Sequence, residues 1–133
     1  VFGLPMASPH DAANALRCAG LMLTELDAWN VARTGRGELP LAIGIGLNYG
    51  PAVMGDVGTE HSLSFTVIGD TVNIASRLQG LTRELKTPLV VADAILTQIG
   101  GDPASLPLAL QDRGERELRG RTAPIRIWTG RDS

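Results

Sequence analysis

The chain has 133 residues, of which 44% are hydrophobic and 20% are charged, and its formal net charge is −2. This length fits one domain with a modest core, and the charge gives no electrostatic basis for binding nucleic acid. The sequence has no zinc-ligand spacing, no apolar run of the roughly 18 residues that span a membrane, and one cysteine, which favours the cytoplasm, or the cytoplasmic face of a membrane if the full-length protein is anchored.

The first predicted element is a helix that begins at Ser8-Pro9 and ends near Val31 or Ala32. Serine is a favoured N-cap, and proline is favoured at the first helical position. Cys18 lies within the apolar pattern of this helix, so we expect it to be buried packing and not a nucleophile. The face expected to cover the core consists of apolar residues at helical spacing: Ala12, Leu16, Ala19, Leu23, Leu26 and Trp29.

A strand is predicted over residues 41–47, where bulky and small side chains alternate. Gly44 and Gly46 leave one face of this strand nearly bare, which permits close approach by another element. That element is either a helix packed tightly over the strand or a ligand. A turn over residues 48–51 and a glycine-rich stretch follow, and the tip of a hairpin is predicted at residues 58–61.

The most informative stretch, residues 65–77, reads FTVIGDTVNIASR. A short β-branched and aromatic strand runs into a Gly-Asp turn, and a helix over residues 71–85 follows. Asn73 and Arg77 lie one turn apart on one face of this helix. An amide and a guanidinium near the positive end of a helix dipole suit a phosphate ester, although a capped helix with a solvated polar face explains the pattern equally well.

The remaining elements are a short helix and several strands. We expect Arg113, Arg116 and Arg126 to be charge-paired on the surface of the last strands. The core stripe of the 71–85 helix is predicted to be Val72, Ala75, Leu78, Leu81 and Leu85. The later elements are a strand over 89–92, a helix over 94–99 capped by Asp93, and strands over 108–113, 116–118 and 124–129.

The longer segment FTVIGDTVNIASRLQGL resembles the signature of class III nucleotidyl cyclases, which make cyclic AMP or cyclic GMP from ATP or GTP. Residues 43–50 and 54–58 upstream, and 88–93 and 118–121 downstream, are similar to further family segments in the family's order. Residues 1–5 look like the tail of the family's second metal-site hairpin. The resemblance implies an α/β fold, an α+β sandwich with a ferredoxin-like core, in which residues 1–133 form the C-terminal portion of a single catalytic domain. The fold would then be truncated at its N-terminal strand and metal-site hairpin.

The resemblance also implies roles for individual residues. Asn73 matches the family position that orients the ribose, and Arg77 matches the residue that stabilises the transition state at phosphorus. Arg121, or as a second choice Arg119, stands where the family usually has a lysine that binds the terminal phosphates. Thr66 falls where the family reads the purine; its hydroxyl can accept a hydrogen bond from an adenine amino group, which favours ATP over GTP.

The family's two metal-binding aspartates, and the lysine with which many members read adenine, would precede Val1 in this numbering. We therefore expect Mg²⁺ or Mn²⁺ only in the intact enzyme, and no cyclase activity from this chain alone. Because family domains pair head to tail and share their sites, the resemblance implies a homodimer that signals through cyclic AMP. An uncovered sheet edge is expected to make the isolated chain self-associate. The alternatives are a guanylate cyclase and a non-catalytic, cyclase-like module for dimerisation or nucleotide sensing.

Overall fold

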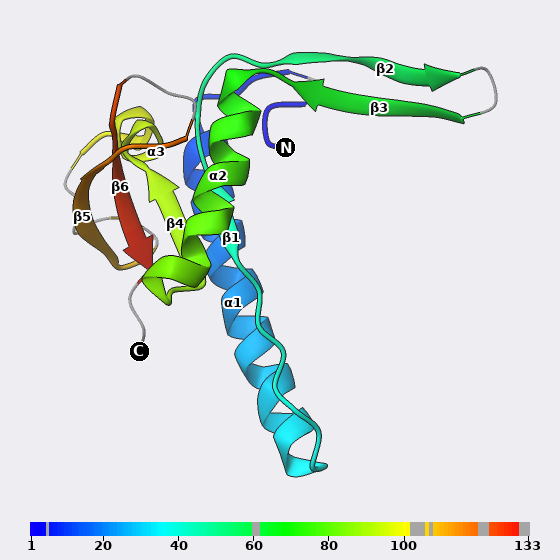
Figure 1. Cartoon of the computed structure of the whole chain (residues 1–133), viewed down its shortest axis with the longest axis vertical. Helices are drawn as coiled ribbons and strands as arrows, with labels where there is room; N and C mark the ends of the chain where they lie inside the picture. The colour runs from blue at the N-terminus through cyan, green and yellow to red at the C-terminus, as the bar shows by residue number, and fades with distance from the viewer. Residues whose placement is uncertain (5, 60–61, 102–105, 107, 120–122, 131–133) are drawn as a thin grey trace.

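The computed structural model describes residues 1–4, 6–59, 62–101, 106, 108–119 and 123–130. Helices and strands are mixed along the chain, which confirms the predicted α/β class (Figure 1). In order, the elements are α1 (Asp11–Gly35), β1 (Ile45–Leu47), β2 (Val53–Thr59), β3 (Ser62–Ile68), α2 (Asp70–Leu85), β4 (Leu89–Ala92), α3 (Asp93–Ile99), β5 (Leu110–Arg116) and β6 (Ile125–Gly130).

A four-stranded sheet in the order β1-β4-β6-β5 forms the centre of the fold. Strand β1 runs parallel to β4, and the other neighbours are antiparallel. Strand β4 has the predicted bounds and is buried on both faces. Leu89 and Val91 pack in a cluster with residues of α1 and α3, while Val90 and Ala92 pack with residues of α2. The sheet is therefore covered by α2 on one face and by α1 and α3 on the other.

Helix α1 extends beyond the sheet that it covers. Its 25 residues rise roughly 37 Å, whereas the four residues of β4 span about 13 Å. Only the first half of α1 therefore reaches the core, where Ala12, Leu16 and Ala19 are buried. Trp29 is 56% exposed, and Cys18 is only half-buried, so both were wrongly predicted as core residues.

The start of α1 also differs from the prediction. The Ser8 hydroxyl accepts a hydrogen bond from the His10 backbone N–H at 3.2 Å, and the Asp11 carboxylate accepts one from the Ser8 N–H at 2.7 Å. These bonds form a turn ahead of the helix, which begins only at Asp11. At its other end the helix continues to Gly35, past the predicted end near Val31 or Ala32.

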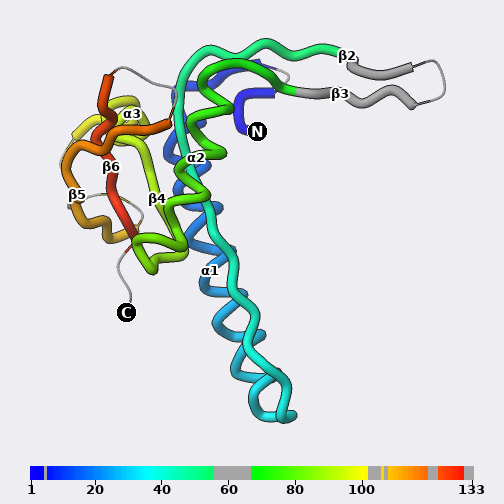
Figure 2. The backbone as a smooth tube through the Cα atoms, in the orientation of Figure 1, coloured from blue at the N-terminus to red at the C-terminus, as the bar shows by residue number. Residues whose placement is uncertain are grey.

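The segment that returns from α1 to the sheet runs alongside the second half of the helix (Figure 2). The Asn30 side-chain amide donates to the Leu41 carbonyl at 2.8 Å, and its oxygen accepts from the Leu41 N–H at 2.7 Å. Asn30 thus occupies both backbone groups of Leu41, and β4, the partner strand of β1, begins only at Leu89, opposite Ile45. The predicted strand over 41–47 is therefore reduced to Ile45–Leu47.

Strands β2 and β3 form a hairpin that stands out from the rest of the molecule (Figure 1). Their antiparallel register runs from Val53 opposite Ile68 to Thr59 opposite Ser62. The hairpin was predicted, but its strands are longer than expected because Gly58 lies within β2. Two residues of the predicted tip, 60 and 61, lie outside the described residues.

A single bulged strand, β5, takes the place of the two strands that were predicted over residues 108–113 and 116–118. Strand β5 is continuous from Leu110 to Arg116, with a shift of register between Asp112 and Glu115. Arg126 contacts Asp112 at 2.6 Å, and Arg116 contacts Glu84 at 3.6 Å, which confirms their predicted charge pairing. Arg113 instead donates from Nε to the Thr129 hydroxyl at 3.0 Å.

Helix α3 is tied to the sheet at its first residue. Asp93 was predicted to cap this helix, but Ala92 occupies the N-cap position and Asp93 lies in the first turn. The Asp93 carboxylate instead accepts a hydrogen bond from Trp128 Nε1 on β6 at 3.0 Å. The Trp128 indole therefore fixes the start of α3 over the sheet.

Candidate active site at the start of helix α2

Helix α2 begins directly after a glycine turn that follows β3. Gly69 is the N-cap residue, with a φ of 138°, a backbone conformation that residues with a Cβ rarely adopt. The Gly69 carbonyl accepts the Asn73 N–H at 3.1 Å, so the first helical hydrogen bond forms at this turn. Asp70 lies in the first turn, where a negative charge is favourable to the helix dipole.

The bare face of β1 is filled by α2. A Cβ on Gly46 would lie 2.4 Å from the Ala75 carbonyl oxygen and 2.4 Å from the Gln79 nitrogen, both of which are backbone atoms of α2. At Gly44 a Cβ would lie 2.2 Å from the Thr82 hydroxyl. Of the two explanations for these glycines, the tightly packed helix is therefore correct.

This close contact changes which side chains of α2 are buried. Ile74, Leu78 and Thr82 are the buried residues, spaced one turn apart along the helix. Leu78 was predicted, whereas Ile74 and Thr82 were missed. The other members of the predicted stripe are only half-buried: Val72, Ala75, Leu81 and Leu85.

Asn73 and Arg77 lie on the exposed side of α2. Arg77 Nη1 donates a hydrogen bond to the backbone carbonyl of Arg119, which follows β5. Leu118, the residue before Arg119, is 5% exposed and belongs to the same core cluster as Ile74. Burial of Leu118 beside α2 therefore brings the carbonyl of Arg119 within reach of Arg77, so two predicted site residues are in contact.

The other predicted site residues are not brought to Arg77 by any described contact. The backbone of Thr66 pairs with Gly55 within the β2–β3 hairpin, and β3 leads through Gly69 into α2. Arg121 lies outside the described residues. Among the residues that the structure describes, no hydrogen bond involves the side chain of Asn73.

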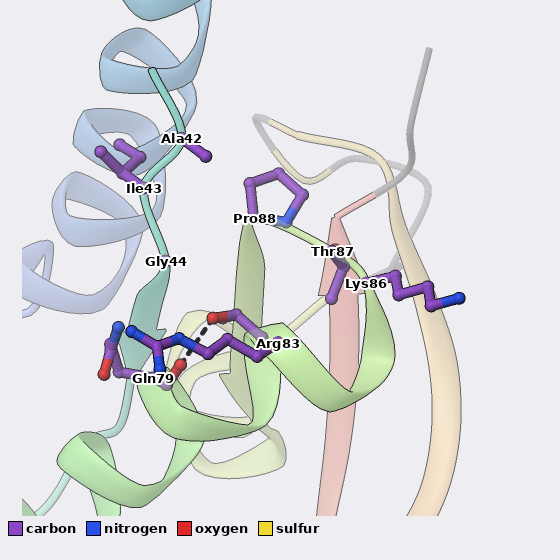
Figure 3. Close-up of a pocket in the computed structure, with 9 residues that line it drawn as sticks. Ala42, Ile43, Gly44, Gln79, Arg83, Lys86, Thr87 and Pro88 are labelled. Atoms are coloured by element: carbon purple, nitrogen blue, oxygen red, sulfur yellow. Dashed lines mark hydrogen bonds between the residues drawn. The ribbon is translucent and has the colours of Figure 1, made fainter. Parts of the chain in front are cut away.

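Two hollows flank α2, and neither contains the Asn73–Arg77 pair. One, of about 320 Å³, lies at the start of α2 and is lined by Asn48, Thr71 and Val72 among others. The second, of about 550 Å³, lies at the C-terminal end of α2 (Figure 3). There Arg83 extends toward Gln79 while Lys86 points away from both, so the two cations do not converge on a common ligand.

Within the described ranges, no group of three or more His, Cys, Asp or Glu side chains could hold a metal ion. No helix in the described part of the chain is long and apolar enough to cross a membrane.

The sequence pattern did not indicate two residues that hold the start of α2. Asn48 Nδ2 donates to the Thr71 carbonyl at 3.1 Å, and the Thr71 hydroxyl donates to the Pro51 carbonyl at 2.6 Å. Residues 48–51 were interpreted only as a turn. The available signal was a polar amide placed directly after a short strand, ahead of Gly50-Pro51.

Comparisons with known proteins agree on one family. Residues 1–129 match the family described as the adenylate and guanylate cyclase catalytic domain. Adenylate cyclase 1 of Rhizobium meliloti is 31% identical over 128 residues, which cover 96% of this chain and 18% of that protein. The adenylate cyclase of Anabaena cylindrica is 36% identical over 118 residues, which cover 86% of this chain and 23% of that protein.

The chain thus spans less than a quarter of the length of these two relatives. Among solved structures, the guanylyl cyclase Cya2 is 30% identical, with a TM-score of 0.78. That match covers 97% of this chain and 62% of the solved one. The fold around α2 is therefore the fold of these catalytic domains.

Proposed function

This chain belongs to the family of adenylate and guanylate cyclase catalytic domains, and we propose that it forms part of the active site of an adenylate cyclase. The reaction converts ATP to cyclic AMP and pyrophosphate. One observation carries the proposal: Arg77 lies on the exposed face of α2, one turn after Asn73, and is anchored on the Arg119 carbonyl. This places a fixed guanidinium beside an amide that is available to a ligand.

The chemistry of cyclisation explains what this pair would do. The ribose 3′ oxygen attacks the α-phosphorus and loses its proton, a new P–O bond forms, and the bond from the α-phosphorus to the bridging oxygen of pyrophosphate breaks. Negative charge spreads over the oxygens of the α-phosphate in the transition state. Arg77 would stabilise that charge through its planar fork of donors. Asn73 would hydrogen-bond the ribose and align its 3′ oxygen for attack.

The terminal phosphates require a further cation. Arg121 is our first choice for this role and Arg119 our second, since residues 118–121 resemble the segment in which the family usually has a lysine that binds these phosphates. Arginine keeps the permanent charge that a family lysine would provide, and it adds a bidentate donor geometry. The proposed substrate-binding residues are therefore Thr66, Arg119 and Arg121.

We propose that a second subunit of the full-length protein completes the site. Asn73 and Arg77 are exposed, and the family resemblance implies that the metal-binding aspartates are not among the residues of this chain. The ligands of the divalent ion would then be carboxylates outside this chain, supplied by the partner subunit of the full-length homodimer. Without those carboxylates, the isolated chain is expected to be inactive. The cytoplasmic location stays a prediction.

The substrate is proposed to be ATP, with GTP as the second candidate. Thr66 favours ATP, and two curated relatives are named adenylate cyclases. GTP is supported by the likeness to the guanylyl cyclase Cya2. Initial rates of the full-length protein with ATP and with GTP, at the same Mn²⁺ or Mg²⁺ concentration, distinguish them. A higher kcat/KM for GTP would make the ATP assignment wrong, and no product from either nucleotide by an intact dimer would identify a non-catalytic module.

Replacing Asn73 by alanine should lower kcat somewhat less than loss of Arg77 does, roughly 10–10²-fold, because orientation is lost and not charge. KM for ATP should change little. The measurement is steady-state production of cyclic AMP by the full-length protein. Gln79→Ala removes another exposed amide from α2 and should leave kcat unchanged. Equal losses in the two variants would show that Asn73 acts only through the stability of the helix.

A further inference from the structure

The first turn of α2 is held against the segment between β1 and β2 by two hydrogen bonds in series. Asn48, half-buried at the end of β1, donates from Nδ2 to the Thr71 carbonyl at 3.1 Å. The Thr71 hydroxyl then donates to the Pro51 carbonyl at 2.6 Å. Asn48 and Pro51 thus hold the same helical residue from both ends of one short turn.

Steric contacts leave little space for α2 to move on this seat. A Cβ on Gly50 would lie 2.6 Å from the Thr71 hydroxyl, and one on Gly46 would lie 2.4 Å from the Ala75 carbonyl oxygen. The first turns of α2 therefore rest on nearly bare backbone. A small rotation or slide of the helix would lengthen the Asn48 bond or close these contacts.

Asn73 depends on this seat for its position. Its side chain forms no hydrogen bond among the described residues, and it lies two residues after Thr71. Arg77 is anchored separately by the Arg119 carbonyl. Among the described residues, the orientation of the Asn73 amide in the site therefore depends on how the first turn of α2 is held.

We infer that Asn48 is a positioning residue: its amide fixes the first turn of α2 and so aligns Asn73 with the nucleotide, while Arg77 is held by its own anchor. This inference rests on the proposed function. Moving a catalytic group by about 1 Å can lower the rate of an enzyme by as much as 10²-fold. Loss of a single hydrogen bond that holds the start of α2 can therefore lower kcat. Asn48 does not touch the substrate itself.

The test uses the full-length enzyme with Asn48→Ala. We expect kcat to fall about tenfold, with KM for ATP within about twofold, because alignment is lost while ground-state binding is kept. The matched control is Thr87→Val, which removes the bond from a buried hydroxyl to the Gly130 carbonyl, 3.2 Å away, just past the C-terminal end of α2. This control should lower Tm to a similar extent and leave kcat unchanged. An equal loss of kcat in both variants would reduce Asn48 to a contributor to stability.

A double-mutant cycle separates positioning from an independent effect. In an Asn73→Ala background, Asn48→Ala should cost much less than about tenfold, because the residue that it aligns is absent. An undiminished loss in that background overturns the inference. If Asn48→Ala does not fold, Asn48→Leu removes the same donor at nearly constant shape, and unchanged kcat in it also overturns the inference. Arg77→Ala with full activity would overturn the proposed function itself, whereas an inactive Arg77→Ala beside a fully active Asn48→Ala overturns only the role of Asn48.

Discussion

Replacement of Arg77 by alanine in the full-length enzyme should lower kcat roughly 10²–10³-fold, the usual effect of removing a preorganised donor to developing charge. KM for ATP should change much less, because the contact strengthens mainly in the transition state. Cyclic AMP formation over a range of ATP concentrations gives both constants. Arg83→Ala removes a second exposed arginine of α2 and should leave both unchanged. If Arg77→Ala keeps its kcat and only unfolds at a lower temperature, the polar face of α2 is merely solvated.

Because the proposed site is shared between subunits, the Arg77 defect should be rescued in trans. An Arg77→Ala chain mixed with a chain that lacks a metal-binding aspartate should regenerate one complete site per heterodimer. Each variant assayed alone should keep its low activity, which provides the baseline for the rescue. Heterodimers that form without recovering activity would show that Arg77 and the metal act within one subunit.

Replacement of Gly46 by alanine should destabilise the fold by about 1–3 kcal/mol, the usual range for overpacking a close contact. The new Cβ would lie 2.4 Å from two backbone atoms of α2, so the helix and β1 would have to separate. Urea unfolding at fixed protein concentration measures the loss.

Gly80→Ala is the matched control on the same helix. A Cβ there meets nothing within 4 Å, so alanine should stabilise α2 by about 0.5–1 kcal/mol through its higher helix propensity. A Gly46→Ala protein as stable as the parent would mean that α2 does not rest on the backbone of β1, and that close packing does not help Asn48 to hold the helix.

Local sequence patterns predicted correctly those helices and strands whose burial in the fold agrees with their composition. The buried strand Leu89–Ala92 was predicted with its bounds, because four apolar residues between a proline and an aspartate leave little choice. The α2 helix and its exposed Asn73–Arg77 face followed from the turn and the spacing after β3. Local patterns could not predict how much of each helix the sheet covers. Helical spacing placed Trp29 on the same face as Leu16, but it did not show that the sheet ends before it reaches Trp29.

Other features depend on partners far away in the sequence. The strand over 41–47 is reduced to Ile45–Leu47, where its partner strand β4 begins at Leu89, and the anchor of Arg77 is a backbone carbonyl 42 residues later. No side-chain pattern marks a carbonyl as a partner. Thr66 and Arg121 stay predictions as site residues, since the structure describes no contact that links either to Arg77.

The pair of hydrogen bonds between Asn30 and Leu41 has a consequence for the free edge of the sheet. Strand β1 is the end strand of the central sheet and has three residues. If residues 41–44 had continued it, the sheet would end in a longer ribbon of backbone groups, a ready template for strands of other molecules. The Asn30 side chain forms the same two hydrogen bonds with Leu41 that a neighbouring strand would form, so Leu41 is not open to another strand. The unpaired edge at this end of the sheet is therefore limited to the short strand Ile45–Leu47.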